Sequence, residues 1–260
     1  MTSSPDPQLA ARTALACLDL TSLNDADVEA DVARLCERAE GPHGAVAALC
    51  VWQRFAAFAR ARLPAHIQVA AVANFPDGSA DVARAVRDTA AIVQAGAQEV
   101  DVVLPFAALM AGQAGAAAQL LQAVRRACDG LTLKVILETG VLADATLIGT
   151  ASRIALDCGA DFLKTSTGKT TVSATPEAAR VMLQAIAASP RAASRVGFKA
   201  SGGIRTVADA KVYIDLCGEL LGAQALTPAR FRIGASSLLN DIETVLGGRG
   251  AVTNAAPGSY

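Results

Sequence analysis

The sequence predicts an α/β protein with one domain, a (β/α)8 barrel of the TIM type, and three observations support this. The chain has 260 residues, close to the about 250 that are typical of one such barrel. Short runs rich in β-branched and apolar residues alternate with longer segments that carry apolar residues at helical spacing, as in a parallel sheet wrapped by helices. Eight such pairs can be counted, and eight units favour closure of the sheet.

The predicted strands are short and bounded by polar residues or glycine, and they cover residues 14–21, 45–51, 67–75, 99–106, 131–140, 160–168, 195–203 and 230–237. Between them, helical spacing is plainest in residues 25–39, 80–96, 175–189 and 207–222. Several of these segments open with Asp or Thr and close with Gly, as helix caps require.

The two ends of the chain depart from the repeating pattern. Residues 1–13 or thereabouts look like an added leader or short helix, and about 248–260 look like a flexible C-terminal tail. Because no linker or low-complexity insert divides the middle, we expect residues 1–260 to form a single catalytic domain.

Composition narrows the classes of partner. Hydrophobic residues make up 52% of the chain, but no stretch approaches the about 20 uninterrupted apolar residues that span a bilayer. The net charge is −1 and no run of Lys and Arg is present, so the sequence has none of the basic pattern typical of nucleic-acid binding. We therefore expect small-molecule partners, no membrane and no nucleic acid.

The cysteines and histidines point away from disulfides and metals. Six cysteines are scattered without a C-x-x-C pair, and the N-terminus has no secretory pattern, so we expect reduced thiols in a cytoplasmic protein. His43 and His66 lie in loop-like segments apart from every other candidate residue. A histidine base or a metal site is therefore not expected.

The lysines are few, and most of them follow predicted strands. The chain has 18 arginines but five lysines, and Lys134, Lys164, Lys169 and Lys199 fall on or just after predicted strands five to seven. Active sites of such barrels lie at the C-terminal ends of the strands. Unlike the arginine guanidinium, a lysine amine can lose its proton and attack a carbonyl.

Lys164 and Lys199 are the best candidates for that chemistry, because the residues preceding both are apolar or small. At neighbouring strand ends the two amines would depress each other's pKa. The alternative is that both are ordinary strand-end residues paired with carboxylates.

Two acidic residues are candidate partners for these lysines. Asp101 has apolar neighbours on both sides, so its carboxylate is expected to point into the barrel mouth beside an ammonium group. Asp19 has the same character at the end of the first predicted strand. The alternative for both is a cap on the following helix.

Segments rich in Gly and Ser follow predicted strands six to eight, with the sequences TSTGKT, ASGGIR and GASS. Glycine lets backbone N–H groups approach an anion, and a following helix N-terminus adds partial positive charge. Loops after strands seven and eight are the common phosphate site of these barrels. Together the three segments predict a phosphate-binding site.

Eight motifs resemble those of the deoxyribose-phosphate aldolase family, in the same order and at similar spacing: DLTSLN, ANFPDG, EVDVVLPF, LKVILETG, GADFLKTSTGK, ATPEAAR, GFKASGGIR and FRIGASSLL. The resemblance runs from about residue 15 to 247 and includes Ser259-Tyr260. It implies a cofactor-free class I aldolase, an aldehyde-lyase that interconverts 2-deoxy-D-ribose 5-phosphate with D-glyceraldehyde 3-phosphate and acetaldehyde. The implied partners are a sugar phosphate and an aldehyde, and a homodimer is a possible assembly.

Matched residue by residue, the resemblance implies that Lys164 forms the Schiff base, that Lys199 lowers its pKa and relays protons, and that Asp101 is the acid and base. Tyr260 would assist proton transfer. The implied substrate-binding residues, which include the phosphate site, are Asp19, Thr21, Leu23, Thr167, Gly168, Lys169, Gly202, Gly203, Arg205, Gly234, Ser236 and Ser237.

The sequence departs from the family pattern in two places. Ala200-Ser201 stands where close members have Pro-Ala, which predicts a looser turn before Gly202 and a weaker grip on phosphate. Val51-Trp52-Gln53 replaces an expected Tyr-Pro pair and concerns packing near the site.

Two other functions remain open at this point. One is a different lysine-dependent barrel lyase or isomerase acting on phosphorylated sugars. The other is a sugar-phosphate-binding protein that has lost catalysis.

Overall fold

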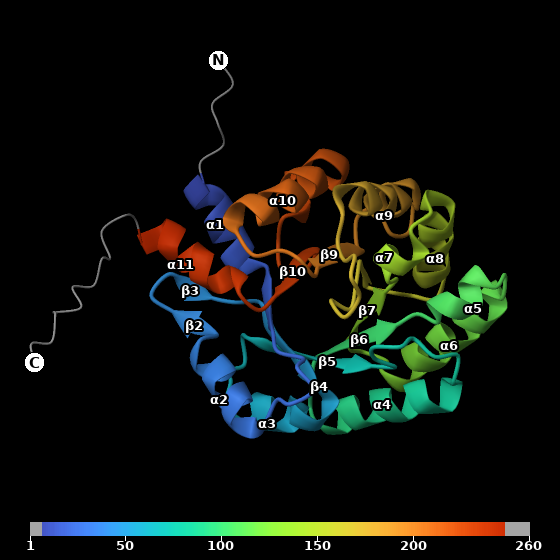
Figure 1. Cartoon of the computed structure of the whole chain (residues 1–260), viewed down its shortest axis with the longest axis horizontal. Helices are drawn as coiled ribbons and strands as arrows, with labels where there is room; N and C mark the ends of the chain where they lie inside the picture. The colour runs from blue at the N-terminus through green and yellow to red at the C-terminus, as the bar shows by residue number, and fades with distance from the viewer. Residues whose placement is uncertain (1–6, 248–260) are drawn as a thin grey trace, which may run out of the picture.

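The computed structural model describes residues 7–247, and these form a closed barrel of parallel strands surrounded by helices (Figure 1). Around the barrel the strand order is β1-β10-β9-β8-β7-β6-β5-β4, so the sheet closes where β1 pairs with β4 on one side and β10 on the other. The bounds are β1 Leu18–Thr21, β4 Ala48–Trp52, β5 Gln68–Ala73, β6 Glu99–Val103, β7 Thr132–Ile136, β8 Phe162–Lys164, β9 Gly197–Ser201 and β10 Phe231–Ala235. The predicted (β/α)8 barrel is confirmed.

Helices fill the connections and pack on the outside of the barrel. They are α1 Pro7–Ala16, α2 Glu29–Glu37, α3 Ala56–Arg60, α4 Val82–Gln94, α5 Phe106–Met110, α6 Ala114–Ala127, α7 Thr139–Leu142, α8 Ala145–Asp157, α9 Pro176–Ala188, α10 Val207–Leu221 and α11 Leu238–Gly247. Short 3-10 turns, η1 Gln53–Phe55 and η2 Ala223–Ala225, and a small antiparallel ribbon of β2 Glu40–Gly41 and β3 Gly44–Ala45 complete the described chain.

Side-chain caps account for the start of most predicted helices. Asp81, Thr175 and Thr206 each accept a backbone N–H from the first turn of α4, α9 and α10, which satisfies a donor that the helix itself cannot. The predicted start of α2 at residue 25 is wrong, because the helix begins at Glu29. The carboxylate of Asp27 is engaged before it, in the turn that follows β1.

The first predicted strand, residues 14–21, starts too early. Residues 14–16 belong to α1, and β1 starts at Leu18. Ala11, Ala14 and Leu15 are buried in the core, so their apolar character reflects one face of a helix, which short apolar runs do not distinguish from a strand. This helix packs against α10 and α11 (Figure 1). It includes the end of the expected leader, whereas residues 1–6 and the expected tail 248–260 lie outside the described chain.

The strand register places charged side chains at the same level of the barrel. Asp101 on β6 is the register partner of Lys134 on β7, and Lys164 on β8 is the partner of Lys199 on β9. Lys199 in turn faces Arg232 on β10. Because residues of a strand alternate between the two faces of a sheet, these positions bring charges from several strands into the barrel interior.

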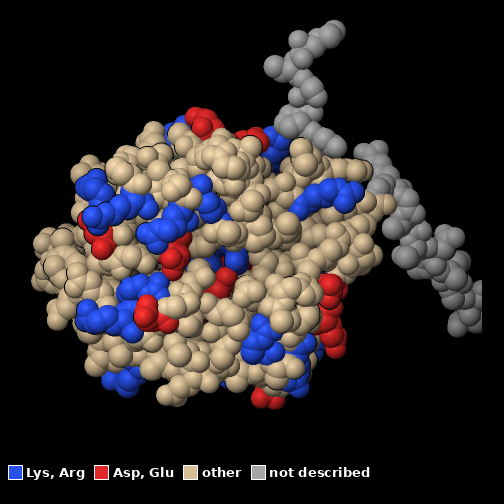
Figure 2. Space-filling view, turned by 180° about the vertical axis from the view of Figure 1, so that it is seen from behind, with Lys and Arg blue, Asp and Glu red and all other residues tan. Residues whose placement is uncertain are grey.

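The outer surface carries its charges in mixed groups. Figure 2 shows Lys and Arg side chains interspersed with Asp and Glu over the face seen there, with uncharged residues between them. Among residues 7–247, no helix is both long enough and apolar enough to cross a bilayer.

Candidate active site

Seven charged side chains from different strands meet inside the barrel, and we call them the charged cluster: Asp19, Glu99, Asp101, Lys134, Lys164, Lys199 and Arg232. All are buried, with at most 5% of any residue exposed. A buried charge is tolerable only when it is paired and hydrogen-bonded. The pairing of each member therefore decides what it can do.

Asp101 is the hub of the charged cluster. One of its carboxylate oxygens accepts hydrogen bonds from the Nζ atoms of Lys164 and Lys199, both at 2.8 Å, and the other accepts from Lys134 at 2.9 Å. Burial alone would raise its pKa, but the three ammonium groups outweigh burial and hold the pKa well below its usual value. Asp101 points among the lysines, as expected, and does not cap a helix.

Lys199 lies between two carboxylates. Its Nζ is 2.5 Å from Asp19 and 2.8 Å from Asp101. Burial lowers its pKa, but the two carboxylates outweigh burial, so the net shift is upward. The predicted lowering of the pKa is therefore wrong for Lys199. Lys199 stays protonated beside Lys164.

Lys164 has fewer partners than the other cations of the cluster. Its Nζ contacts the carboxylate of Asp101, and within residues 7–247 no second carboxylate forms an ion pair with it. Lys164 is also the member of the cluster that lines the adjacent cavity. This amine can therefore meet a ligand.

Sequence reasoning missed Glu99 and Arg232 and left Lys134 without a role. Arg232 spans Glu99 at 2.7 Å and Asp19 at 2.6 Å, while Lys134 lies 2.5 Å from Glu99. Burial raises the pKa of Asp19, but Lys199, Arg232 and Lys134 outweigh it and lower the pKa overall. Charged residues spaced by two within a buried strand, as in Glu99 and Asp101, were the signal that could have revealed this layer.

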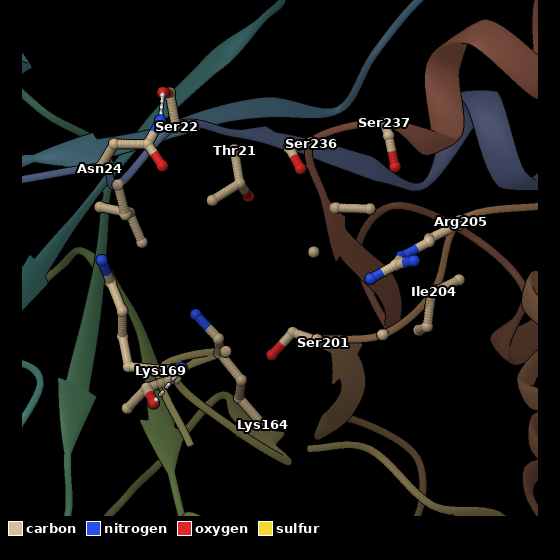
Figure 3. A pocket seen from close by; sticks show the side chains of 17 residues that line it. Thr21, Ser22, Asn24, Lys164, Lys169, Ser201, Ile204, Arg205, Ser236 and Ser237 are labelled. Carbon is tan, nitrogen blue, oxygen red and sulfur yellow. Dashed lines mark hydrogen bonds between the residues drawn. The ribbon is translucent and has the colours of Figure 1, made fainter. Parts of the chain in front are cut away.

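A cavity of about 300 Å³ lies over Lys164 at the C-terminal ends of β1, β8, β9 and β10. Figure 3 shows Lys164 extending into it from below and Arg205 from the right, with Ser236 and Ser237 along the upper edge. Of the predicted substrate residues, those lining it are Thr21, Leu23, Thr167, Gly168, Lys169, Gly202, Gly203, Arg205, Gly234, Ser236 and Ser237. Ser22, Asn24, Ser201, Ile204 and Ala235 also line it and were not predicted.

The remaining predicted residues do not line this cavity. Asp19, Asp101 and Lys199 lie within the fully buried part of the charged cluster, behind Lys164, which lines the cavity. Tyr260 lies outside the described residues. Across residues 7–247, no group of three or more His, Cys, Asp or Glu side chains could hold a metal ion.

One side of the cavity is built mainly from backbone, and we call it the glycine rim: Gly168, Lys169, Gly202, Gly203, Arg205, Ser236 and Ser237. Gly202 has φ +84°, and a Cβ there would lie 2.5 Å from the side chain of Ser173, so a side chain is excluded. Helix α11 begins directly after Ser237, and the start of a helix favours an anion.

Two residues of the glycine rim, Lys169 and Arg205, carry positive charge. Within the described chain no carboxylate forms an ion pair with Arg205, which leaves its guanidinium available to an anion. Lys169 is 31% exposed at its side chain and lies 3.5 Å from Asp25. Its Nζ also lies 6.0 Å from the ring of Trp52, whose Nε1 donates to the Asn24 carbonyl. The Trp52 departure thus builds the wall beside Lys169.

Hydrogen bonds of Ser201 hold the turn before Gly202, which the sequence predicts to be looser. The Ser201 hydroxyl donates to the Ser166 carbonyl at 2.6 Å, and the Ser201 backbone exchanges two hydrogen bonds with the Thr165 hydroxyl. These bonds join the ends of β8 and β9, so Ser201 restrains the turn in place of a proline ring.

Comparison with known proteins agrees with this geometry. Residues 13–243 match the DeoC/LacD family of aldolases. Over 255 residues the chain is 47% identical to the deoxyribose-phosphate aldolase of Agrobacterium fabrum, covering 97% of each sequence.

Solved structures show the same architecture. An apo protein of Toxoplasma gondii, assigned as a deoxyribose-phosphate aldolase, superposes with TM-score 0.85 at 25% identity, covering 93% of this chain and 98% of that one. The tetrameric deoxyribose phosphate aldolase of Aeropyrum pernix gives TM-score 0.71 at 24% identity, with 93% and 97% covered. These likenesses support the barrel found here.

Proposed function

We propose that this chain, which belongs to the DeoC/LacD family of aldolases, reversibly cleaves 2-deoxy-D-ribose 5-phosphate to D-glyceraldehyde 3-phosphate and acetaldehyde through a Schiff base on Lys164. One observation carries the proposal: a buried amine opens into a cavity whose far side is the glycine rim. The amine fits the sugar carbonyl and the rim fits the phosphate. The named relative from Agrobacterium fabrum supports this choice of substrate.

The other six members of the charged cluster balance each other's charge without Lys164. Asp19, Glu99 and Asp101 supply three negative charges, and Lys134, Lys199 and Arg232 supply three positive charges. A protonated Lys164 would add a fourth positive charge in a buried region, which is unfavourable. Lys164 has the fewest carboxylate partners in the cluster and lines the cavity, so it is the amine best placed to attack a carbonyl.

In the proposed reaction, the neutral Lys164 amine attacks C1 of the open-chain sugar and forms a carbinolamine. Loss of water gives an iminium ion, whose positive nitrogen is an electron sink. Asp101, acting through water and with Lys199, takes the proton of the C3 hydroxyl as the C2–C3 bond breaks. The bonding electrons move toward nitrogen, which leaves an enamine on Lys164 and releases the triose phosphate as an aldehyde. Protonation of the enamine carbon and hydrolysis then release acetaldehyde and restore the amine.

The glycine rim holds the phosphate in this proposal. Backbone N–H groups of Gly202, Gly203 and the start of α11 would bind its oxygens, with Arg205 and Lys169 supplying positive charge. The distance across the cavity then sets which carbon of the sugar meets Lys164.

Trapping with borohydride tests the Schiff base. Incubation with acetaldehyde and sodium borohydride should leave an ethyl group on Lys164, located by mass spectrometry of peptides. Lys164→Ala should lose cleavage of deoxyribose 5-phosphate by at least about 10⁴-fold, whereas Lys211→Ala, on α10, should not change the rate. An ethyl group found on Lys199 or Lys134 instead would overturn the assignment.

We also infer that the protein works in the cytoplasm, in the degradation of deoxyribose phosphates. Its six cysteines are all free thiols, which is typical of a reducing compartment.

A further inference from the structure

Glu138 is a buried acidic residue that the proposed reaction does not use. It lies two residues after the end of β7 and has φ 56° and ψ 59°, the left-handed conformation. That conformation is uncommon and costly for a residue other than glycine, and such strain concentrates at functional positions. The residue itself is fully buried.

The carboxylate of Glu138 binds the segment that follows β8. It accepts the backbone N–H of Thr167 at 3.3 Å, the Thr167 hydroxyl, and the Thr170 hydroxyl at 3.3 Å, which shares its one hydrogen with the Val172 carbonyl at 2.8 Å. The Thr167 hydroxyl oxygen in turn accepts the backbone N–H of Lys169 at 3.0 Å. A chain of hydrogen bonds therefore runs from Glu138 to the backbone of Lys169.

No Lys or Arg side chain within the described residues forms an ion pair with Glu138. Burial is the main cause that raises its pKa, against the hydrogen bonds from Thr167 and Thr170 and the charge of the nearby Lys164. A buried carboxylate without an ion pair is a costly means of stabilising a fold. Its three donors all come from residues 167–170, so what it fixes is that segment.

The neighbouring Lys164 is held by different bonds. Its carbonyl accepts from Leu137 in the sheet, and its amine contacts Asp101. Residues 167–170 have left the sheet, and the Glu138 carboxylate holds them through Thr167 and Thr170. Gly168 and Lys169 in this segment belong to the glycine rim.

We propose that Glu138 is a positioning residue that fixes residues 167–170 against the phosphate and so sets the preference of this enzyme for phosphorylated over unphosphorylated aldehyde sugars. The inference rests on the proposed function. Glu138 does not line the cavity and touches no substrate in this scheme. It acts through Thr167 and Lys169.

The test compares Glu138→Gln and Glu138→Ala with wild type on 2-deoxyribose 5-phosphate and on 2-deoxyribose. The Gln variant keeps one oxygen acceptor, so kcat/KM for the phosphorylated sugar should fall by about 3-fold, and by about 10-fold or more in the Ala variant. The loss should reside in KM. With 2-deoxyribose, and for ethyl trapping by acetaldehyde, both variants should stay within about 2-fold of wild type. Glu219→Gln on α10 is the matched control.

Thr170→Val removes one donor and keeps the carboxylate, so it tests the same contact if the Glu138 variants fold poorly. Its effect should have the same direction and about the size of the Gln variant. Equal losses on the two sugars, or no loss on either, would overturn the inference.

Binding of inorganic phosphate, measured by calorimetry, separates this inference from the proposed function. Weaker phosphate binding in Glu138→Ala supports the role of Glu138 even if wild type fails to cleave the sugar, a result that would overturn the proposed function alone. Unchanged phosphate binding in that variant counts against Glu138.

Discussion

The charged cluster and the glycine rim border one cavity but are built in opposite ways. Cluster residues lie on strands, are buried, and pair with each other through side chains. Rim residues lie on loops and offer backbone N–H groups, hydroxyls and two cations to the cavity. The sheet therefore fixes the amine of Lys164, whereas the loops shape the cavity that this amine faces, which is the division typical of this fold.

The two regions also differ in what a substitution should cost. Removing one partner from a buried ion-pair network leaves charges uncompensated and affects folding as well as activity. Removing a rim cation affects a partly exposed group and should change substrate binding alone. Four substitutions or conditions test this difference.

Asp101→Asn should have the largest effect, because Lys134, Lys164 and Lys199 share this carboxylate. We expect kcat to fall by about 10²- to 10⁴-fold and the free energy of unfolding to fall by about 3–5 kcal/mol. Steady-state kinetics and urea denaturation measure the two effects. Asp215→Asn on α10 is the control, and a kcat within about 10-fold of wild type would contradict the role of Asp101.

The pH dependence of stability should follow the same cluster. The pKa values of Asp19 and Asp101 are below their usual 3.8 in the folded protein, so their stabilisation is present above that value and is lost as the pH falls. The pKa of Lys199 is above its usual 10.5, so its stabilisation is present below that value and is lost as the pH rises.

We therefore expect these three groups to add nothing to the pH dependence of the urea midpoint between about pH 4 and pH 10, with losses of up to about 1.4 kcal/mol per pH unit for each group beyond it. Burial raises the pKa of the Cys17 and Cys217 thiols from 9.0, so stability also falls above about pH 9, where these thiols ionise in the unfolded chain. A midpoint that rises on acidification below pH 4 would show that these carboxylates are not held by cations.

Gly234→Ala tests whether Gly234 affects the charged cluster or the glycine rim. Gly234 lines the cavity, but a Cβ there would lie 2.9 Å from the Ser201 side chain and 3.0 Å from Cε of Lys199. The methyl group should displace Lys199 and lower kcat by about 10-fold, with KM for the phosphorylated sugar within about 3-fold. Gly149→Ala on α8, where a Cβ meets ordinary contacts, is the matched control. A change in KM alone would show that Gly234 acts in substrate binding, as predicted from the sequence.

Lys169→Met should have the smallest effect of the four. The side chain is partly exposed, so we expect KM for deoxyribose 5-phosphate to rise by about 5- to 10-fold with kcat nearly unchanged. The trapping rate with acetaldehyde, which has no phosphate, should match wild type. Lys211→Met serves as control, and a loss of trapping would place Lys169 in the chemistry.

Much of the charged cluster could be predicted from sequence because strand periodicity places its residues. Lys164, Lys199 and Asp101 stand out as charges within buried strands. Arg232 also lies in a predicted strand, but its partners Asp19 and Glu99 lie 213 and 133 residues away. Pairing over such separations depends on the register of the barrel strands, which cannot be predicted from the local sequence.

The rest of the site depends on how loops fold back. In the sequence, Glu138 is a residue near the end of a predicted strand, with nothing to set it apart. Its contacts are visible only in the structure, where residues 167–170 lie against it. The direction of the Lys199 pKa shift was missed for a similar reason, since two carboxylates on other strands decide it. The predicted boundary between α1 and β1 was wrong because a buried helix and a buried strand have similar sequences over a few residues.

Closure of the barrel has a consequence for synthesis of the chain. Asp19 on β1 pairs in register with Gly234 on β10, and its carboxylate binds Lys199, 180 residues downstream. Contacts this distant in sequence form slowly and late in folding. A nascent chain on the ribosome holds Asp19 long before Lys199 and Arg232 emerge, so the charged cluster is complete only when the final strand docks. Translation must be nearly finished before this enzyme can begin to work.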